Sequence, residues 1–119
     1  MHKINIKPLS LNHAYRGRRF ATYELKKFKN DTYDALPPKY LLKLNFGANN
    51  PILELNVTYG TSKANDLDNL NKTFIDVLTE KYGFNDNKIH KITSIKHPVQ
   101  KGEEYICFEL KEYHDIITP

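Results

Sequence analysis

Hydrophobic residues alternate with polar ones or recur at helical spacing in several short runs of this chain. The alternation from residue 2 to residue 7 predicts a short strand that stops at Pro8. A basic helix is predicted from an N-cap at Thr22 to about Tyr33, because two prolines follow soon afterwards. The intervening segment has no clean period, and its arginines, glycine and asparagine predict an exposed functional loop.

Four further runs of alternating residues predict strands. Residues 42–46 and 53–59 read as one hairpin, with turn-forming residues between them. Residues 89–95 and 105–110 read as a second pair of strands, joined by a turn that contains proline and glycine.

The clearest helical pattern runs from Asp68 to Tyr82. One apolar stripe follows this segment, acids lie at its start, and Gly83 comes where a helix often ends. The order strand, helix, hairpin, helix, hairpin predicts an α+β fold. We expect a single domain over residues 1–119, with two main helices on a mixed sheet of four to five strands.

Composition narrows the class of protein. A chain of 119 residues with 39% hydrophobic residues is long enough for one core. Eighteen Lys and Arg against fourteen Asp and Glu give a net charge of +4, which is compatible with a polyanionic partner. The basic residues concentrate near the first helix: Arg16, Arg18, Arg19, Lys26, Lys27 and Lys29. A solvated face without a partner is the alternative explanation of that stretch.

Cysteine usage and hydropathy bear on the compartment. Cys107 is the single cysteine, so there is no internal disulfide, and its apolar neighbours predict a buried thiol in a strand. The chain has neither an N-terminal signal-like stretch nor a long apolar run. We therefore expect a cytoplasmic protein that does not associate with membranes.

Two carboxylates, Asp66 and Asp68, lie two residues apart where a loop enters the second helix. An extended backbone there directs both to one side, and Mg²⁺ prefers one or two carboxylates together with water and substrate phosphate. Lys72 follows one helical turn after Asp68 and can stabilise charge on a phosphate. The same residues also fit an ordinary helix start with an Asp N-cap and an i,i+4 ion pair.

Asp86 is a third candidate acid, located after the second helix. A helix from Asp68 to Lys81 rises about 20 Å, and five extended residues recover only about 17 Å. Asp86 joins the pair only if the chain returns nearly straight along the helix, if the helix is shorter, or if a second subunit supplies it. The sequence leaves these three routes open.

The residues around these acids resemble the RusA family of Holliday-junction resolvases. The similarity rests on Asp66-Leu67-Asp68-Asn69-Leu70-x-Lys72, then Asp76, Asp86 and Lys96-x-Pro98-x-x-Lys101-Gly102, and more weakly on Pro8-x-Ser10-x-Asn12 and Tyr15-Arg16. It implies a homodimeric endonuclease that nicks four-way DNA junctions symmetrically with Mg²⁺ or Mn²⁺. The family's three catalytic aspartates and its lysine map onto Asp66, Asp68, Asp86 and Lys72.

The chain departs from the family at two places. An arginine run often precedes the first aspartate in family members, whereas here Lys63 is the only charged residue in the four positions before Asp66. Two consecutive acids are common at the later site, whereas Asn85 precedes Asp86 here. We therefore expect DNA phosphates to be bound by residues spread along the chain: Arg16, Arg18, Arg19, Lys63, Lys96 and Lys101.

Two other functions compete with the nuclease. A non-catalytic nucleic-acid-binding module would use basic residues on phosphates and tyrosines on bases. A small protein-interaction domain would leave its charges solvated. A zinc site is unsupported, because His13, His90 and His97 lack partners at ligand spacing.

Overall fold

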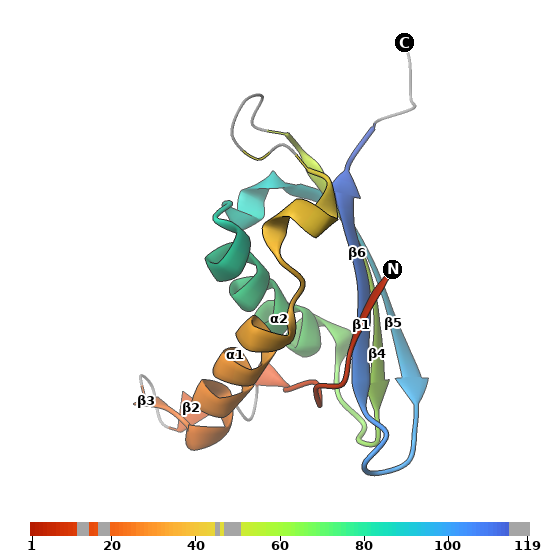
Figure 1. Ribbon diagram of the computed structural model, residues 1–119. Coiled ribbons are helices and arrows are strands. Elements are labelled where there is room, and N and C mark those ends of the chain that lie inside the picture. Colours follow the sequence, from red (N-terminus) through yellow and green to blue (C-terminus); the bar gives the residue numbers. More distant parts are fainter. Residues whose placement is uncertain (12–14, 17–19, 45, 47–50, 115–119) are drawn as a thin grey trace.

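A four-stranded mixed sheet with two helices on one face forms the body of the protein (Figure 1). The computed structural model describes residues 1–11, 15–16, 20–44, 46 and 51–114. The sheet order is β1-β6-β4-β5. The strands of this sheet are β1 (His2–Ile4), β4 (Leu53–Thr61), β5 (Ile89–Pro98) and β6 (Tyr105–Glu112). The two helices are α1 (Tyr23–Ala35) and α2 (Leu67–Tyr82). The predicted α+β class is confirmed.

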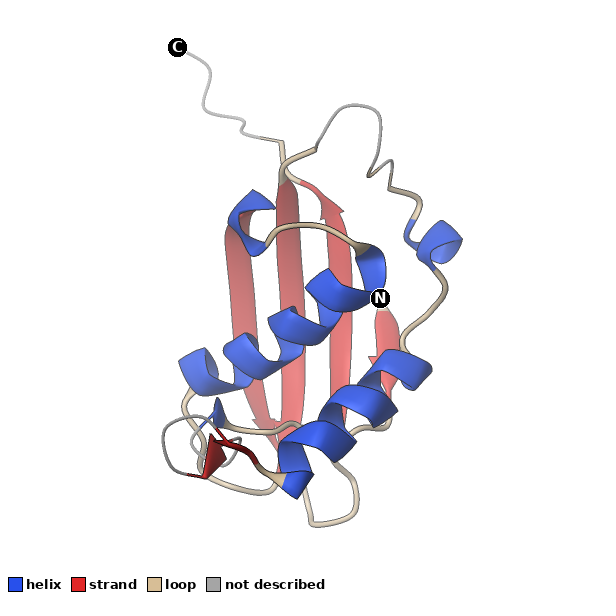
Figure 2. Ribbon diagram, turned by 90° about the vertical axis from the view of Figure 1, so that its left-hand side faces the viewer, coloured by secondary structure: helices blue, strands red, loops and turns tan. Residues whose placement is uncertain are grey.

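The core lies between the sheet and the helices (Figure 2). Successive side chains of a strand point to opposite faces, so the alternating apolar residues of β4 and β6 all reach the helical side. The apolar stripe of α2 packs onto them. These residues are almost completely buried: Leu53, Leu55, Val57, Tyr59, Leu70, Phe74, Val77, Leu78, Tyr82, Ile106, Phe108 and Leu110.

The connection from β4 through α2 to β5 makes the central pair of strands parallel. β6 then pairs antiparallel with β4 on its other side. Both edges of β4 are therefore occupied, which makes the two predicted hairpins wrong. β5 and β6 do not pair with each other, because β4 lies between them, and no edge of β4 is left for residues 42–46.

The smaller elements differ from the prediction as well. Residues 42–46 were predicted to form a strand. Leu42 instead ends a 3₁₀ helix, η2 (Lys39–Leu42), and its side chain is buried in the core. β1 ends at Ile4 and is thus shorter than expected. The predicted functional loop contains two short strands, β2 (Tyr15–Arg16) and β3 (Phe20–Ala21), which pair with each other.

Both predicted helices form, with end groups close to those expected. Thr22 is the N-cap of α1, and its hydroxyl accepts a hydrogen bond from the Leu25 N–H at 3.2 Å. Gly83 ends α2 with φ 71°, a left-handed conformation that glycine adopts without steric cost. Within the described residues, no helix has both the length and the hydrophobicity of a membrane span.

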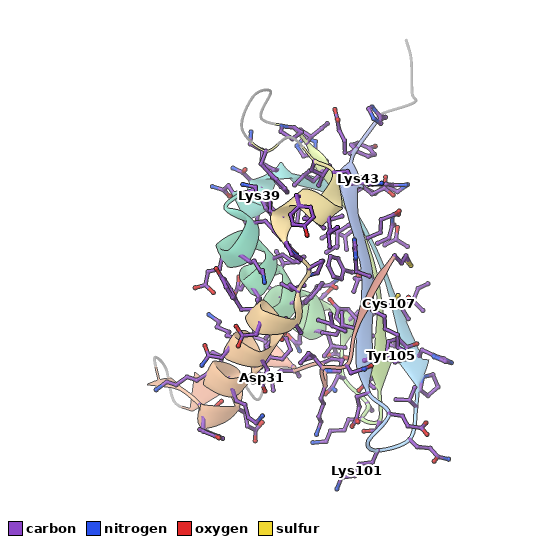
Figure 3. All side chains as sticks on the ribbon, viewed as in Figure 1. Asp31, Lys39, Lys43, Lys101, Tyr105 and Cys107 are labelled. Carbon is purple, nitrogen blue, oxygen red and sulfur yellow. The ribbon has the colours of Figure 1, made fainter. Side chains whose placement is uncertain are left out.

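The sheet face away from the helices is uncovered, and Cys107 and Tyr105 belong to that face (Figure 3). Cys107 is half-buried, with its Sγ 3.8 Å from Met1 Sδ. The prediction of a buried thiol is therefore wrong. Its neighbours Ile106 and Phe108 point into the core, so the alternation of the strand turns Cys107 outward.

Gly60 lies under the ring of Tyr105 on this outer face. A Cβ at Gly60 would lie 2.3 Å from two ring carbons of Tyr105. We expect Gly60→Ala to lower the free energy of unfolding by about 1–3 kcal/mol, measured by urea denaturation, because the strand and the ring must move apart. In a Tyr105→Ala background the same change should cost much less. An equal cost in both backgrounds would contradict this explanation.

Candidate functional site

Asp66 and Asp68 lie where the loop that follows β4 enters α2. This point is beyond the carboxyl end of β4. Asp66 is the N-cap of α2, with extended backbone angles of φ −77° and ψ 137°. Asp68 belongs to the first helical turn. Leu67 between them packs against the core, while both aspartates are exposed. The two carboxylates are therefore presented to solvent from the same short segment.

Neither carboxylate has a side-chain partner in the part of the chain that the structure describes. The Asp66 side chain makes no capping hydrogen bond; its backbone carbonyl instead accepts from the N–H groups of Asn69 and Leu70 at 3.1 and 3.2 Å. Over residues 1–11, 15–16, 20–44, 46 and 51–114, neither aspartate forms a side-chain hydrogen bond or an ion pair. Asp68 gains only the favourable field at a helix start. Both side chains are free to bind a ligand.

The loop before Asp66 is fixed by its neighbours. The Thr61 hydroxyl oxygen accepts from the Lys63 N–H at 3.2 Å and from the Asn65 amide at 3.5 Å. Lys96 of β5 donates from Nζ to the Asn65 carbonyl at 2.7 Å. Lys96 thus helps to position the segment that carries Asp66, a role that the sequence did not suggest.

Asn71 anchors the first turns of α2 to the sheet. Its Oδ1 accepts from the Tyr59 hydroxyl and from the Ser94 hydroxyl, both at 2.8 Å. Burial raises the pKa of the Tyr59 hydroxyl far above its usual value, so this group stays a neutral donor. One amide therefore joins α2 to β4 and β5. Nothing in the sequence marks this anchor, because the three residues meet only in the folded chain.

Asp86 lies at the opposite end of the sheet from Asp66 and Asp68. It begins the 3₁₀ helix η3 (Asp86–Lys88), directly before β5, and Ile89 pairs with Leu53 at the start of β4. The length of β4, about 26 Å at 3.3 Å per residue, separates the two ends. Within the described chain, no three Asp, Glu, His or Cys side chains are placed to hold one metal ion.

This arrangement excludes two of the three routes left open for Asp86, and supply by a second subunit stays a prediction. α2 is 16 residues long, so the helix is not shorter than predicted. The chain returns toward Asp66 only along β5, and Asp86 lies before that strand begins. Within one chain, Asp86 therefore does not join this pair of aspartates.

Lys72 and Asp76 follow Asp68 along the exposed side of α2. The pKa of Asp76 is raised, chiefly because partial burial disfavours the charged form. The positive charge of Lys29 opposes this rise, whereas the negative charge of Asp86 adds to it.

A raised carboxyl pKa in the folded state destabilises the fold at neutral pH. This loss in the free energy of unfolding is complete above the pKa of the folded state. It disappears as the pH falls below the ordinary pKa of an aspartate. We expect Asp76→Asn to raise the free energy of unfolding at pH 7, and this gain to shrink as the pH falls through the range of Asp titration. Denaturation curves at several pH values measure it, with Asp34→Asn as the control on an exposed part of α1. A gain that is independent of pH would contradict the electrostatic explanation.

The predicted DNA-binding residues are placed unevenly. Lys63 lines a surface groove of about 520 Å³ together with Lys101 of the β5–β6 turn. Lys7 lines the same groove, although nothing in its sequence context marks it. Figure 3 shows Lys101 reaching beyond the lower end of the sheet, where β4 also ends. These three lysines therefore gather on the side of the molecule that carries Asp66.

One of the arginines predicted to bind DNA lies in the β2–β3 hairpin. Arg16 belongs to β2, and Arg18 and Arg19 lie outside the described residues. Figures 1 and 2 both place the hairpin at the lower end of the molecule, near the first turns of the two helices. The hairpin and the aspartates thus share one end of the protein.

No protein-family model matches this chain, and a search of curated proteins finds no match either.

Proposed function

We propose that this protein is a metal-dependent endodeoxyribonuclease that nicks four-way DNA junctions in the cytoplasm. One observation carries the proposal: Asp66 and Asp68, two exposed carboxylates without partners among the described residues, lie beside a groove lined by Lys7, Lys63 and Lys101. Carboxylates next to lysines suit a substrate that is itself a polyanion, because the lysines bind phosphates while the acids bind a cation.

The residues present fit Mg²⁺, with Mn²⁺ as a substitute. Mg²⁺ is usually held by one or two carboxylates together with waters and substrate phosphates. Asp66 and Asp68 would therefore be enough as the ligands that the protein supplies. The ion would supply Lewis-acid polarisation of the phosphodiester and stabilise the leaving oxygen. Asp86 is assigned to the same site through the resemblance to the RusA family.

The remaining roles belong to side chains around the pair. Lys72, one turn after Asp68, is proposed to contact the scissile phosphate and stabilise its developing charge. Lys63 and Lys101 would hold flanking phosphates. The hydrogen bonds of Asn71 and Lys96 keep the first turn of α2 and its loop in place, which limits the reorganisation needed on binding.

A homodimer completes this proposal. Since Asp86 of one chain lies far from its own Asp66 and Asp68, each site would combine the pair from one subunit with Asp86 from the other. A two-fold dimer has two equivalent sites, which suits two symmetrical cuts in a four-way junction.

The test is a nicking assay on a synthetic four-way junction. We expect paired nicks with Mg²⁺, none with EDTA, and much slower cutting of a linear duplex of the same sequence. The competing function, a non-catalytic nucleic-acid-binding module, predicts salt-sensitive binding that divalent ions do not change, and no nicking in any condition. Salt-sensitive DNA binding without any nicking would overturn the proposed nuclease function.

A further inference from the structure

A hollow of about 470 Å³ lies directly beside the loop that carries Asp66. Residues 5–10, the first half of α1 and the loop between β4 and α2 form its walls. In Figure 1 the segment after β1 runs from the sheet toward the helices at the lower end of the molecule. The volume falls within the range of about 300–1,000 Å³ that is typical of small-ligand sites. We call this hollow the side pocket.

The side pocket has an apolar interior with amide groups among its walls. Ile6, Leu9 and Phe28 contribute the apolar surface, and Phe28 is 6% exposed. Asn5 and Asn65 add amides, which carry both donors and acceptors. An apolar hollow with a few polar groups suits a flat heterocycle whose edge carries hydrogen-bonding groups, as a nucleobase does.

Two lysines connect the side pocket to the groove that contains Lys101. Lys7 and Lys63 line both hollows, and both are exposed. Neither lysine has an ion-pair partner among the residues that the structure describes. Hydrogen bonds, chiefly from its own backbone N–H, lower the pKa of the nearby Glu104 carboxyl, and the charge of Lys7 adds to this effect without forming an ion pair. Phosphates of a strand that enters the pocket would therefore meet two exposed lysine side chains.

Two acids also line the side pocket, and one of them is already paired with a lysine of α1. Asp31 is paired with Lys27 at 2.8 Å, so this part of the wall is neutral overall. Glu24 remains as one exposed carboxylate in the wall. A carboxylate can accept a hydrogen bond from the exocyclic amino group of a base, so Glu24 is compatible with a nucleobase in the pocket.

We propose that the side pocket binds one unpaired nucleotide of a DNA strand, with its base inside and its phosphates on Lys7 and Lys63. The inference rests on the proposed nuclease function and names a part of its substrate. Asn65 in the pocket wall is followed immediately by Asp66, so a nucleotide held there places its neighbouring phosphodiester beside the aspartates. Bases that are already unpaired leave the stack at the lowest cost, which favours branch points as substrates.

The test compares two single strands of equal charge in the presence of EDTA, where cutting does not interfere. One is a strand of six deoxycytidines, and the other is the same backbone with six abasic sites. Fluorescence anisotropy of the intact wild-type protein should show about tenfold tighter binding of the strand that carries bases. Equal affinities for the two strands would overturn the proposal, because lysines alone bind both equally.

A matched pair of variants tests whether the preference for the strand with bases comes from the side pocket. Asn5→Met puts a longer, non-aromatic side chain at the pocket, and Asn30→Met makes the same change on α1 outside it; both asparagines are exposed. We expect Asn5→Met to reduce the preference for bases to less than about threefold, while Asn30→Met keeps it near tenfold. Thermal unfolding should give the same Tm for both variants. A full preference in Asn5→Met would overturn the assignment to this pocket.

Junction nicking with Mg²⁺, measured in parallel, separates the two proposals. Nicking by a protein that shows no preference for bases overturns the side pocket and leaves the nuclease intact. A preference that Asn5→Met removes, in a protein that never nicks, supports the pocket and overturns the nuclease.

Discussion

Asp68→Asn is expected to reduce Mg²⁺-dependent nicking of a four-way junction by about 100-fold or more. The asparagine keeps the shape of the side chain but removes the charge that binds the cation. Lewis-acid stabilisation is worth several kcal/mol, and about 1.4 kcal/mol corresponds to a tenfold change in rate. Initial rates on a labelled junction, at saturating protein and with varied Mg²⁺, measure the effect.

The fold should tolerate this substitution. Asp68 is exposed and has no partner among the described side chains, so the urea midpoint should stay close to that of the wild type. Asp34→Asn removes the same charge from an exposed part of α1 and serves as the matched control with full activity. Nicking by Asp68→Asn at the wild-type rate would exclude this aspartate from the reaction.

A mixture of Asp68→Asn and Asp86→Asn subunits is expected to recover nicking that neither variant has alone. If Asp86 acts across the dimer, each mixed dimer contains one site with both native aspartates and one site with neither. Random exchange puts about half of the subunit pairs into mixed dimers, so about a quarter of all sites recover. The products should be single nicks rather than paired ones.

The opposite arrangement gives a different result. If each chain used its own Asp86, every site in the mixture would carry one substitution, and no activity would return. Exchange of subunits must be verified by mass spectrometry of the mixed dimers, with tags of different mass. A mixed dimer that is present but inactive would contradict the role of Asp86 in trans.

The helices were predictable because their signals are local. A capping hydroxyl at Thr22 and a glycine at position 83 act within a few residues of the helix ends, and the apolar stripe of α2 repeats along its own length. The α+β class followed from the order of these elements. All of this depends on neighbours in the chain, which the sequence displays directly.

Strand pairing was not predictable in the same way. The alternation in residues 53–59 marks a strand with one buried face, and it says nothing about which strands lie on its two edges. The α2 crossover makes β5 parallel to β4 and places β4 between β5 and β6. Adjacent strands in the sequence were therefore mistaken for hairpins.

The sequence by itself determined that Asp66 and Asp68 lie at a helix start, because the alternation of polar and apolar residues there is local. Only the tertiary structure decided that both carboxylates lack partners among the described residues and that Asp86 lies at the other end of β4. It also brought Lys7 and Lys63 together, from segments far apart in the chain. Such distances depend on long-range strand pairing, which is fixed by the burial of a shared core and not by any short motif.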